Sequence, residues 1–173
     1  EAGAAARALD LCSGSGAVGV TIAAERPLAQ VDLVELSPEA AAVAERNAQK
    51  HAPGRVRVLC GDLFAALPER VRYDVITANP PYVPTVHGRQ LAPDILDHEP
   101  HAALFAGEDG LSVIRRIAAG LPDWLLQGAI FVTEIDPGQA AAVAGLLRDA
   151  GLVQVRVERD LAGLDRHVTG RGP

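Results

Sequence analysis

Several residue types are scarce in this sequence, and each scarcity narrows what the chain can be. The chain contains no methionine, one lysine (Lys50), three phenylalanines, two tyrosines and one tryptophan. With so few aromatic side chains, a buried core has to be built mainly from Ala, Val, Leu and Ile. The absence of methionine extends to the initiator, so we expect the sequence to be part of a longer chain.

Long apolar runs and dense positive charge are missing too. No run approaches the roughly 20 apolar residues that a membrane-spanning helix needs, and the Ala-rich start lacks the layout of a secretory signal. We therefore expect a cytoplasmic protein without a membrane segment. The formal net charge is -6, and the arginines are scattered. Because phosphate contacts supply much of the affinity of nucleic-acid enzymes, we expect no direct nucleic-acid partner.

No metal or redox motif is recognisable. Cys12 and Cys60 fit no metal-binding spacing, and we expect two buried thiols in a reducing compartment. His98, Glu99 and His101 form H-E-x-H, whereas a helical zinc motif is H-E-x-x-H. They adjoin a proline in an expected loop, so we predict no metal site.

The sequence does contain a regular alternation of apolar runs and helical patterns. Its 173 residues, 49% apolar and 22% charged, fit one globular domain. Strands are expected at residues 8–12, 31–35, 55–60, 73–78, 128–135, 152–158 and 165–170, and helices at 17–25, 38–50, 110–121 and 138–150. Near-continuous apolar strands separated by helices indicate a parallel sheet covered on both faces. The prediction is one doubly wound, Rossmann-like α/β domain over residues 1–173, with a mostly parallel seven-stranded sheet.

Local signals mark some of the connections. Ser37 is an expected N-cap with Pro38 at the first helical position. Asp136-Pro137-Gly138 is expected to turn a strand into the next helix, and Trp124 to make an amphipathic contact at a helix end. Residues 82–107 show no sustained period, and a loop of that length is usually functional or disordered.

Three polar features follow successive strands, where ligands bind in doubly wound sheets. The first is the run Asp10-Leu11-Cys12-Ser13-Gly14-Ser15-Gly16, which leads from the first expected strand through small residues into a helix. Small residues allow a ligand to approach the backbone and the helix N-terminus. Glu35 can accept hydrogen bonds from both hydroxyls of a ribose. Asp62 is placed to accept one from an adenine amino group. Together these features predict an adenosine-containing ligand.

The same glycines leave the identity of that ligand open. Gly14, Gly16 and Gly19 also satisfy G-x-G-x-x-G, and Glu35 lies 19 residues beyond Gly16, as in a dinucleotide-binding unit. On this motif alone, an oxidoreductase that uses a nicotinamide or flavin remains an alternative.

The run Asn79-Pro80-Pro81-Tyr82 directly follows the fourth expected strand. Two consecutive prolines remove two backbone donors and restrict φ at both positions. What remains is a rigid corner with two acceptors, the Asn79 side-chain oxygen and the Pro80 carbonyl. These acceptors can take both hydrogens of a planar NH₂ group, and the Tyr82 ring can pack against it.

Such a corner suits the methylation of an amide or aromatic amine. The lone pair of such a nitrogen is delocalised, and accepting both hydrogens returns electron density to the nitrogen. The methyl donor S-adenosylmethionine is itself a strong electrophile, so alignment and preorganised dipoles suffice for catalysis. Asn79, Pro80 and Tyr82 are the expected catalytic residues, and Pro81 completes the substrate site.

At this point the sequence resembles the HemK/PrmC family of glutamine methyltransferases, which act on peptide chain release factors. The matching segments occur in family order from about Leu9 to Arg171. They are DLCSGSGAVGV, VELSPEAAAVAERNA, GDLFAALP, ITANPPYV, HEPHAALFAGEDGL and RDLAGLDRHVTGR. NPPY is shared with adenine amino-group methyltransferases of DNA, whereas the HEP-containing segment is more particular to the glutamine enzymes.

The resemblance implies a class I methyltransferase fold with S-adenosylmethionine bound by the 12–16 loop, Glu35, the Asp62-Leu63 turn and Asn79. It implies a glutamine of a Gly-Gly-Gln loop as substrate, held by Asn79, Pro80 and Tyr82 and covered by residues 83–107. It also implies an N-terminal helical domain outside this sequence, and we expect a monomer.

The chain departs from the family pattern at three positions. Cys12 replaces a usual glycine, Glu35 a common Asp and His98 a frequent Phe.

Three other functions remain open beside protein-glutamine methylation. An adenine methyltransferase of DNA or RNA is disfavoured by the acidic charge and by the lack of a target-recognition domain. A nicotinamide oxidoreductase leaves the NPPY corner unexplained, and the chain has no Tyr-x-x-x-Lys pair. A non-enzymatic adenosine-nucleotide-binding scaffold would need no pocket shaped for an amide.

Overall fold

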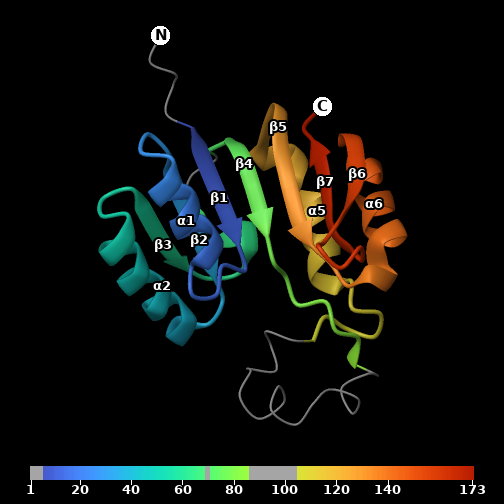
Figure 1. Ribbon diagram of the computed structural model, residues 1–173, viewed down its shortest axis with the longest axis horizontal. Helices are drawn as coiled ribbons and strands as arrows, with labels where there is room; N and C mark the ends of the chain where they lie inside the picture. Colours follow the sequence, from blue (N-terminus) through green and yellow to red (C-terminus); the bar gives the residue numbers. More distant parts are fainter. Residues whose placement is uncertain (1–5, 69–70, 86–104) are drawn as a thin grey trace.

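The computed structural model describes residues 6–68, 71–85 and 105–173, which form a sheet flanked by helices (Figure 1). The strands are β1 (Arg7–Leu11), β2 (Gln30–Glu35), β3 (Val56–Cys60), β4 (Tyr73–Ala78), β5 (Leu125–Glu134), β6 (Val153–Arg159) and β7 (Asp165–Arg171). The helices are α1 (Ala17–Glu25), α2 (Pro38–His51), α5 (Ser112–Trp124) and α6 (Ala140–Asp149), with 3₁₀ turns η1 (Leu63–Ala66) and η3 (Pro137–Gln139). The predicted alternation of strands and helices is therefore confirmed.

The strand order places a topological switch point in the middle of the sheet. The seven strands run β3-β2-β1-β4-β5-β7-β6. Strands β1 to β5 are parallel, whereas β7 is antiparallel to both β5 and β6. The chain leaves β1 toward β2 on one side and returns to β4 on the other. Ligands of doubly wound sheets bind at this point, beyond the carboxyl ends of the strands.

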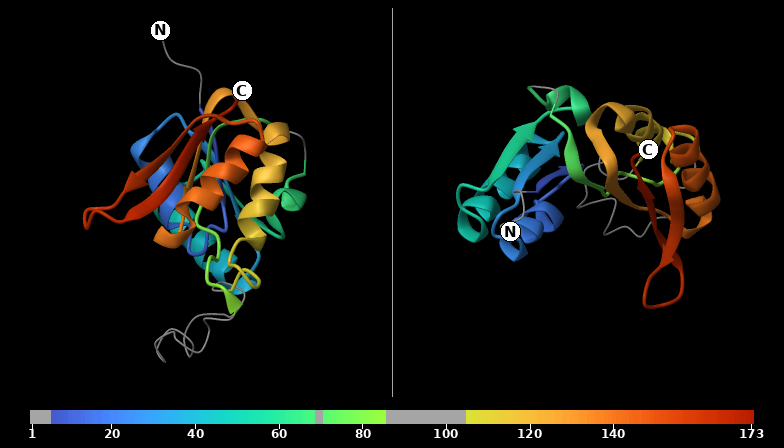
Figure 2. Two further views of the ribbon diagram at one scale, coloured as in Figure 1. Left: turned by 90° about the vertical axis from the view of Figure 1, so that its right-hand side faces the viewer. Right: turned by 90° about the horizontal axis from the view of Figure 1, so that it is seen from above.

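Two apolar cores hold the helices on opposite faces of the sheet (Figures 1 and 2). Helices α1 and α2 pack mainly through alanines, including Ala23, Ala44 and Ala48, onto Val31 and Leu33. The other face packs against α5 and α6 in a larger core. Its fully buried members include Leu9, Leu11, Ile76, Phe131, Ile117, Leu121, Val143 and Leu147. The expected core of Ala, Val, Leu and Ile is confirmed, because Tyr73 and Phe131 are its only fully buried aromatic residues among those described.

Several local predictions are confirmed. Ser37 caps α2, since its Oγ accepts a hydrogen bond of 3.2 Å from the Ala40 N–H, and Pro38 is the first helical residue. The Asp136 side chain caps η3, which leads from β5 into α6. Trp124, at the end of α5, stacks on Phe64 with ring centroids 5.6 Å apart.

No described helix is long and apolar enough to cross a membrane.

Two expectations are wrong. Helix α5 does not end at residue 121 but continues through Pro122 to Trp124. A proline this close to the helix end removes only one intrahelical hydrogen bond, and the buried side chain of Leu121 keeps the last turn on the core. Cys60 is not a buried thiol: it is exposed at the end of β3, while Cys12 is half-buried. Both cysteines are unpaired.

Candidate active site

Strand register brings the predicted site residues to one edge of the sheet. Leu11 is paired with Val34 on one side and with Ala78 on the other, and Glu35 is paired with Cys60. The residues that follow these positions therefore emerge together at the carboxyl ends of the strands. They are Cys12 after β1, Glu35 at the end of β2, Asp62 after β3 and Asn79 after β4.

The 12–16 loop has left-handed backbone at every second residue. The φ angles are 55° at Cys12, 55° at Gly14 and 79° at Gly16. The Gly16 N–H closes the loop with a hydrogen bond of 2.8 Å to the Ser13 carbonyl, and α1 begins at the next residue. Left-handed φ favours glycine, so the non-glycine residue at position 12 stores backbone strain.

The three glycines of this region have different physical roles. A Cβ on Gly19 would lie 2.1 Å from a methyl group of Leu33, and one on Gly16 would lie 3.0 Å from the same side chain. These two glycines therefore allow α1 to pack closely on β2. A Cβ on Gly14 would meet no atom within 4 Å. The space beside Gly14 is thus open, and a ligand can approach the backbone there.

Glu35 links the loop to the end of β2. Its Oε2 accepts a hydrogen bond of 2.8 Å from the Gly14 N–H, and its Oε1 accepts one of 2.9 Å from the Ser37 N–H. The carboxylate is half-buried. Each of its oxygens has a second lone pair, so both can still accept from a pair of hydroxyl groups. The predicted role of Glu35 toward a ribose is compatible with this geometry.

Asp10 is a buried carboxyl group at the start of the loop motif, and the sequence had suggested no role for it of its own. It is 3% exposed, and its two oxygens accept hydrogen bonds from the Gly19 N–H (3.0 Å) and the Thr77 hydroxyl (2.7 Å). Burial raises the pKa of Asp10 to about 6, against the lowering effect of these two donors. Asp10 therefore fixes the start of α1 to the end of β4. A charged residue inside the apolar strand at residues 8–12 was the available signal.

The Asp62-Leu63 turn follows β3. Asp62 forms an ion pair with Arg116 of α5, with 2.6 Å between Oδ2 and Nη2. Leu63 has a left-handed φ of 47°, and its side chain is buried. Leu36, which follows Glu35, leaves 57% of its surface exposed. The turns that contain Leu36 and Asp62 are joined by the bond from the Gly61 N–H to the Glu35 carbonyl (2.9 Å). An exposed apolar side chain and a carboxylate on adjoining turns suit a flat heterocycle with an amino group.

The Asn79–Tyr82 corner turns the chain away from the end of β4. All peptide bonds in the described residues are trans, so the two prolines form this corner without a cis bond. Asn79 is exposed, Pro80 is buried, and Pro81 and Tyr82 are half-buried. The Tyr82 hydroxyl donates a hydrogen bond of 3.4 Å to Glu134 at the end of β5. Burial and the charge of Glu134 raise the pKa of Tyr82, so the phenol keeps its proton at neutral pH.

Gln139 on η3 is a second residue that sequence reasoning missed. Its side-chain nitrogen donates to the backbone carbonyl of Tyr82 at 2.9 Å and lies 3.3 Å and 3.4 Å from the carbonyls of Gly110 and Asp109. One side chain thus connects the corner after β4 to the turn before α5. No local motif could have predicted this, because Gln139 is 57 residues from Tyr82 in the sequence.

Backbone hydrogen bonds also join the residues that follow Tyr82 to those that precede the turn before α5. The Thr85 N–H donates to the Gly107 carbonyl at 2.8 Å, and the Ala106 N–H donates to the Val83 carbonyl at 3.0 Å. The two ends of the predicted 83–107 covering segment are therefore held together beside Tyr82. Residues 86–104, which include His98, Glu99 and His101, lie outside the described residues.

The residues at this edge fit an adenosine cofactor. The backbone at Gly14 is open, and Glu35 retains free lone pairs. The Ser13 hydroxyl is buried and has no hydrogen-bond partner among the described residues, and such an atom usually marks a missing partner. Cys12 does not obstruct the site chemically, since burial raises the pKa of its thiol to about 12.

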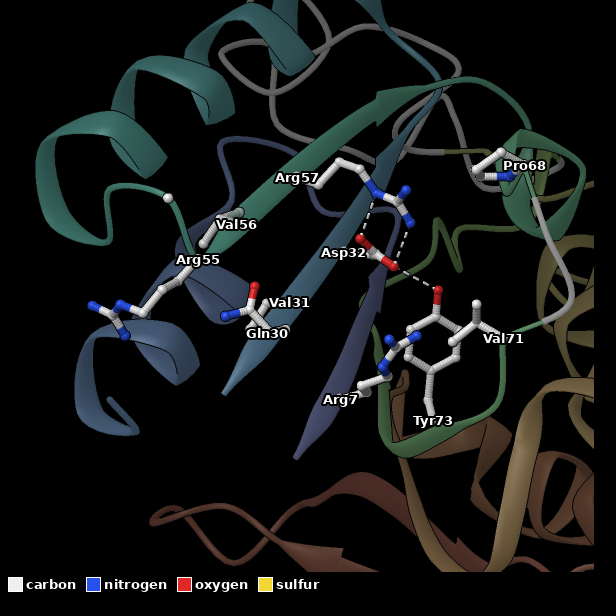
Figure 3. A pocket seen from close by; sticks show the side chains of 11 residues that line it. Arg7, Gln30, Val31, Asp32, Arg55, Val56, Arg57, Pro68, Val71 and Tyr73 are labelled. Carbon is white, nitrogen blue, oxygen red and sulfur yellow. Dashed lines mark hydrogen bonds and ion pairs between the residues drawn. The ribbon is translucent and has the colours of Figure 1, made fainter. Parts of the chain in front are cut away.

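A cavity of about 380 Å³ lies near the opposite, amino-terminal ends of the parallel strands (Figure 3). Its lining includes Asp32, whose carboxylate accepts two hydrogen bonds from Arg57 (2.8 and 2.9 Å) and one from the Tyr73 hydroxyl (2.7 Å). These groups lie in the amino-terminal halves of the strands and satisfy one another. This cavity is therefore separate from the candidate active site.

The sheet topology also separates two of the sequence hypotheses. Dinucleotide-binding domains of the Rossmann type have the strand order 3-2-1-4-5-6. Here an antiparallel β7 lies between β5 and β6. The G-x-G-x-x-G match is thus accounted for by helix packing at Gly16 and Gly19, as described above.

Comparisons with known proteins agree with this geometry. The methyltransferase small domain matches residues 1–109. The release factor glutamine methyltransferase of Bordetella pertussis is 47% identical over 163 residues, which cover 94% of this chain and 60% of that protein. The protein of the same name from Cereibacter sphaeroides is 46% identical, covering 97% of this chain and 60% of that protein. These relatives confirm the resemblance that the motifs indicated.

The fold is shared more widely. A methyltransferase from Pyrococcus furiosus superposes with a TM-score of 0.71 at 18% identity, covering 98% of this chain and 77% of that chain. The present chain spans about 60% of the length of the curated relatives that it matches. Its fold is that of a class I methyltransferase, and the chain belongs to the methyltransferase small domain family.

Proposed function

We propose that this chain is the catalytic part of a protein-glutamine methyltransferase. Its reaction transfers a methyl group from S-adenosylmethionine to the side-chain amide nitrogen of a glutamine, in the Gly-Gly-Gln loop of a peptide chain release factor. The relatives named for this activity support the choice of substrate. Because that substrate belongs to translation, we place the reaction in the cytoplasm.

The observation that carries the proposal is the position of Asn79. It follows Ala78, which is paired across the sheet with Leu11, and Leu11 leads directly into the 12–16 loop. The group that would hold the substrate nitrogen and the loop that would hold the methyl donor are thus neighbours at the switch point. A transfer between two bound molecules requires this proximity, because holding the reactants together removes most of the entropic cost of their encounter.

The corner presents hydrogen-bond acceptors to the substrate amide. Asn79 Oδ1 and the Pro80 carbonyl would each accept one hydrogen of the glutamine NH₂ group. Pro81 contributes no N–H that could compete for these acceptors. Tyr82 would contact the planar amide with its ring. Two hydrogen bonds hold Tyr82 in place, one from its hydroxyl to Glu134 and one from the Gln139 side chain to its backbone carbonyl.

The opposite side of the site would bind the cofactor. When bound, S-adenosylmethionine supplies an electrophilic methyl group on a sulfonium sulfur. Glu35 would accept from the two ribose hydroxyls and Asp62 from the adenine amino group. The 12–16 loop would lie against the cofactor where Gly14 leaves open space. Leu36 would provide an apolar contact for the adenine, which explains its exposure in this structure.

Adenine amino-group methylation is the second candidate, since NPPY and the bound cofactor would serve it equally well. The net charge of -6 and the single lysine argue against it.

The test is incubation of this chain with labelled S-adenosylmethionine and either a release factor or single-stranded DNA and RNA. Label on the release factor that maps to the Gly-Gly-Gln glutamine, and is lost when that glutamine is replaced by alanine, is the expected result. Label on adenine and none on the protein would reject the proposal in favour of the second candidate.

A further inference from the structure

Helix α5 places an arginine beside the carboxylate that is expected to recognise adenine. Arg116 Nη2 lies 2.6 Å from Asp62 Oδ2, and the two side chains are 56% and 48% exposed. The charge of Arg116 also opposes, weakly, the rise in pKa that burial causes at Cys12. Arg116 therefore lies near two of the segments that form the cofactor side of the site, the 12–16 loop and the Asp62-Leu63 turn.

The position of Arg116 is fixed by its helix. Its neighbours in α5, Ile114 and Ile117, are 3% and 0% exposed and belong to the larger core. Arg115, the preceding residue, points elsewhere and forms an ion pair with Asp109. Of the two adjacent arginines, Arg116 alone reaches Asp62, and it does so from a rigid base.

The ion pair occupies only one oxygen of the carboxylate. Arg116 binds Oδ2, and no described residue donates a hydrogen bond to Oδ1. An exposed aspartate on a turn otherwise rotates among several rotamers, and a ligand that needs one of them must overcome that entropy. A carboxylate already held by a guanidinium has lost this freedom before the ligand arrives.

We propose that Arg116 is a positioning residue for adenine recognition. It would hold the Asp62 carboxylate so that Oδ1 remains the acceptor for the adenine amino group. The inference rests on the proposed cofactor, and it adds a residue that lies 54 positions from Asp62 in the sequence. It concerns the selection of adenine over bases that lack the amino group, and not the methyl transfer itself.

The test compares two ligands by calorimetry. S-adenosylhomocysteine carries the amino group, and S-inosylhomocysteine has a carbonyl oxygen in its place. We expect wild-type protein to bind the adenosine compound more tightly. Arg116→Ala should lower the affinity for S-adenosylhomocysteine by about 5- to 20-fold, as expected for a charge-assisted contact, and should change the affinity for the inosine compound little. The affinity of Arg116→Lys for S-adenosylhomocysteine should lie between those of wild-type protein and Arg116→Ala.

Two controls separate a positioning role from a structural one. Arg148→Ala removes an exposed arginine from α6 and should change neither affinity. In an Asp62→Ala background, Arg116→Ala should have no further effect on the preference for adenosine, because the acceptor is already lost.

The outcomes distinguish the two proposals. Wild-type protein that binds neither ligand would reject the proposed function together with this inference. Wild-type protein that prefers the adenosine compound, with an unchanged preference in Arg116→Ala, would overturn only the role of Arg116.

Discussion

The backbone N–H of Gly14 donates a hydrogen bond of 2.8 Å to Oε2 of Glu35, and so ties the 12–16 loop to the neighbouring strand. The same carboxylate accepts from the Ser37 N–H through its other oxygen. Glu35 therefore has a structural role in the free protein and a proposed ligand-binding role in the complex. Its replacement should affect both.

We expect Glu35→Ala to weaken S-adenosylhomocysteine binding by about 10- to 100-fold, because hydrogen bonds to a charged group contribute roughly 1.5–3 kcal/mol. Calorimetry measures this directly. Glu45→Ala is the matched control, since it removes an equal charge from the exposed face of α2 and should leave the affinity unchanged. Equal affinities for both variants would remove Glu35 from the site.

The left-handed backbone at Cys12 gives a prediction about side-chain shape. Glycine adopts φ near 55° without strain, whereas a β-branched residue does so poorly. Cys12→Gly should change the free energy of unfolding by less than about 1 kcal/mol, because relief of strain offsets lost packing and added chain entropy. Cys12→Val should lower it by about 1–3 kcal/mol. Urea unfolding of both variants checks this, and a Val variant as stable as the Gly variant would contradict it.

Burial of Asp10 should make stability depend on pH in an unusual direction. The pKa of this carboxyl rises from 3.8 to about 6 on folding, so the native state holds the proton more tightly. Its contribution to the free energy of unfolding is therefore fully present below pH 4 and is lost as the pH rises through about 6. The loss approaches about 3 kcal/mol for a shift of this size.

Asp10→Asn removes this titration while keeping the side chain's size. Relative to the variant, wild-type protein should lose up to about 3 kcal/mol of unfolding free energy between pH 4 and pH 7. Urea unfolding at several pH values measures the difference, in which the other titrating groups cancel. Parallel stability profiles for the two proteins would show that Asp10 has an ordinary pKa.

Gly110 lies so close to Tyr82 and Gln139 that a side chain at this position should disturb the site, although Gly110 is distant from Asn79 in the sequence. A Cβ there would lie 2.3 Å from the Tyr82 carbonyl oxygen and 2.6 Å from Gln139 Nε2, and φ is +73°. Gly110→Ala should separate the Tyr82 corner from the Gln139 contact. We expect lower stability by roughly 1–3 kcal/mol from the strain and slower methyl transfer.

Gly145→Ala on α6 is the matched control for this change. A Cβ at Gly145 meets no atom within 4 Å, and alanine in a helix is more stable than glycine by roughly 0.5–1 kcal/mol. This variant should be slightly stabilised and fully active. If the two alanine variants had the same stability and turnover, the link between Gly110 and the corner would have no functional role.

The sequence predicted the features that depend on local pattern. Apolar runs and helical periods were sufficient for all seven strands, and the pair Ser37-Pro38 was sufficient for the cap of α2. The position of Asn79 after the fourth strand followed from the same pattern, because the carboxyl ends of parallel strands share one edge. The expected end of α5 at residue 121 was three residues too early, because the helix continues through Pro122 with Leu121 buried in the core.

Contacts between distant segments could not be predicted in this way. The bonds from Arg116 to Asp62 and from Gln139 to Tyr82 depend on how helices pack on the sheet, and neither residue belongs to a motif. The exposure of Cys60 has the same origin, since it depends on the position of β3 at the edge of the sheet. A single sequence contains no signal for such relationships.

The central claim is that the Asn79 side chain binds the substrate nitrogen beside the methyl donor. The most direct measurement is single-turnover methyl transfer by Asn79→Ala to a release factor, alongside calorimetry with S-adenosylhomocysteine. The account predicts transfer slowed by roughly 10²–10³-fold, as for the loss of one preorganised polar contact, with cofactor binding largely retained. Transfer at the wild-type rate in this variant would contradict it.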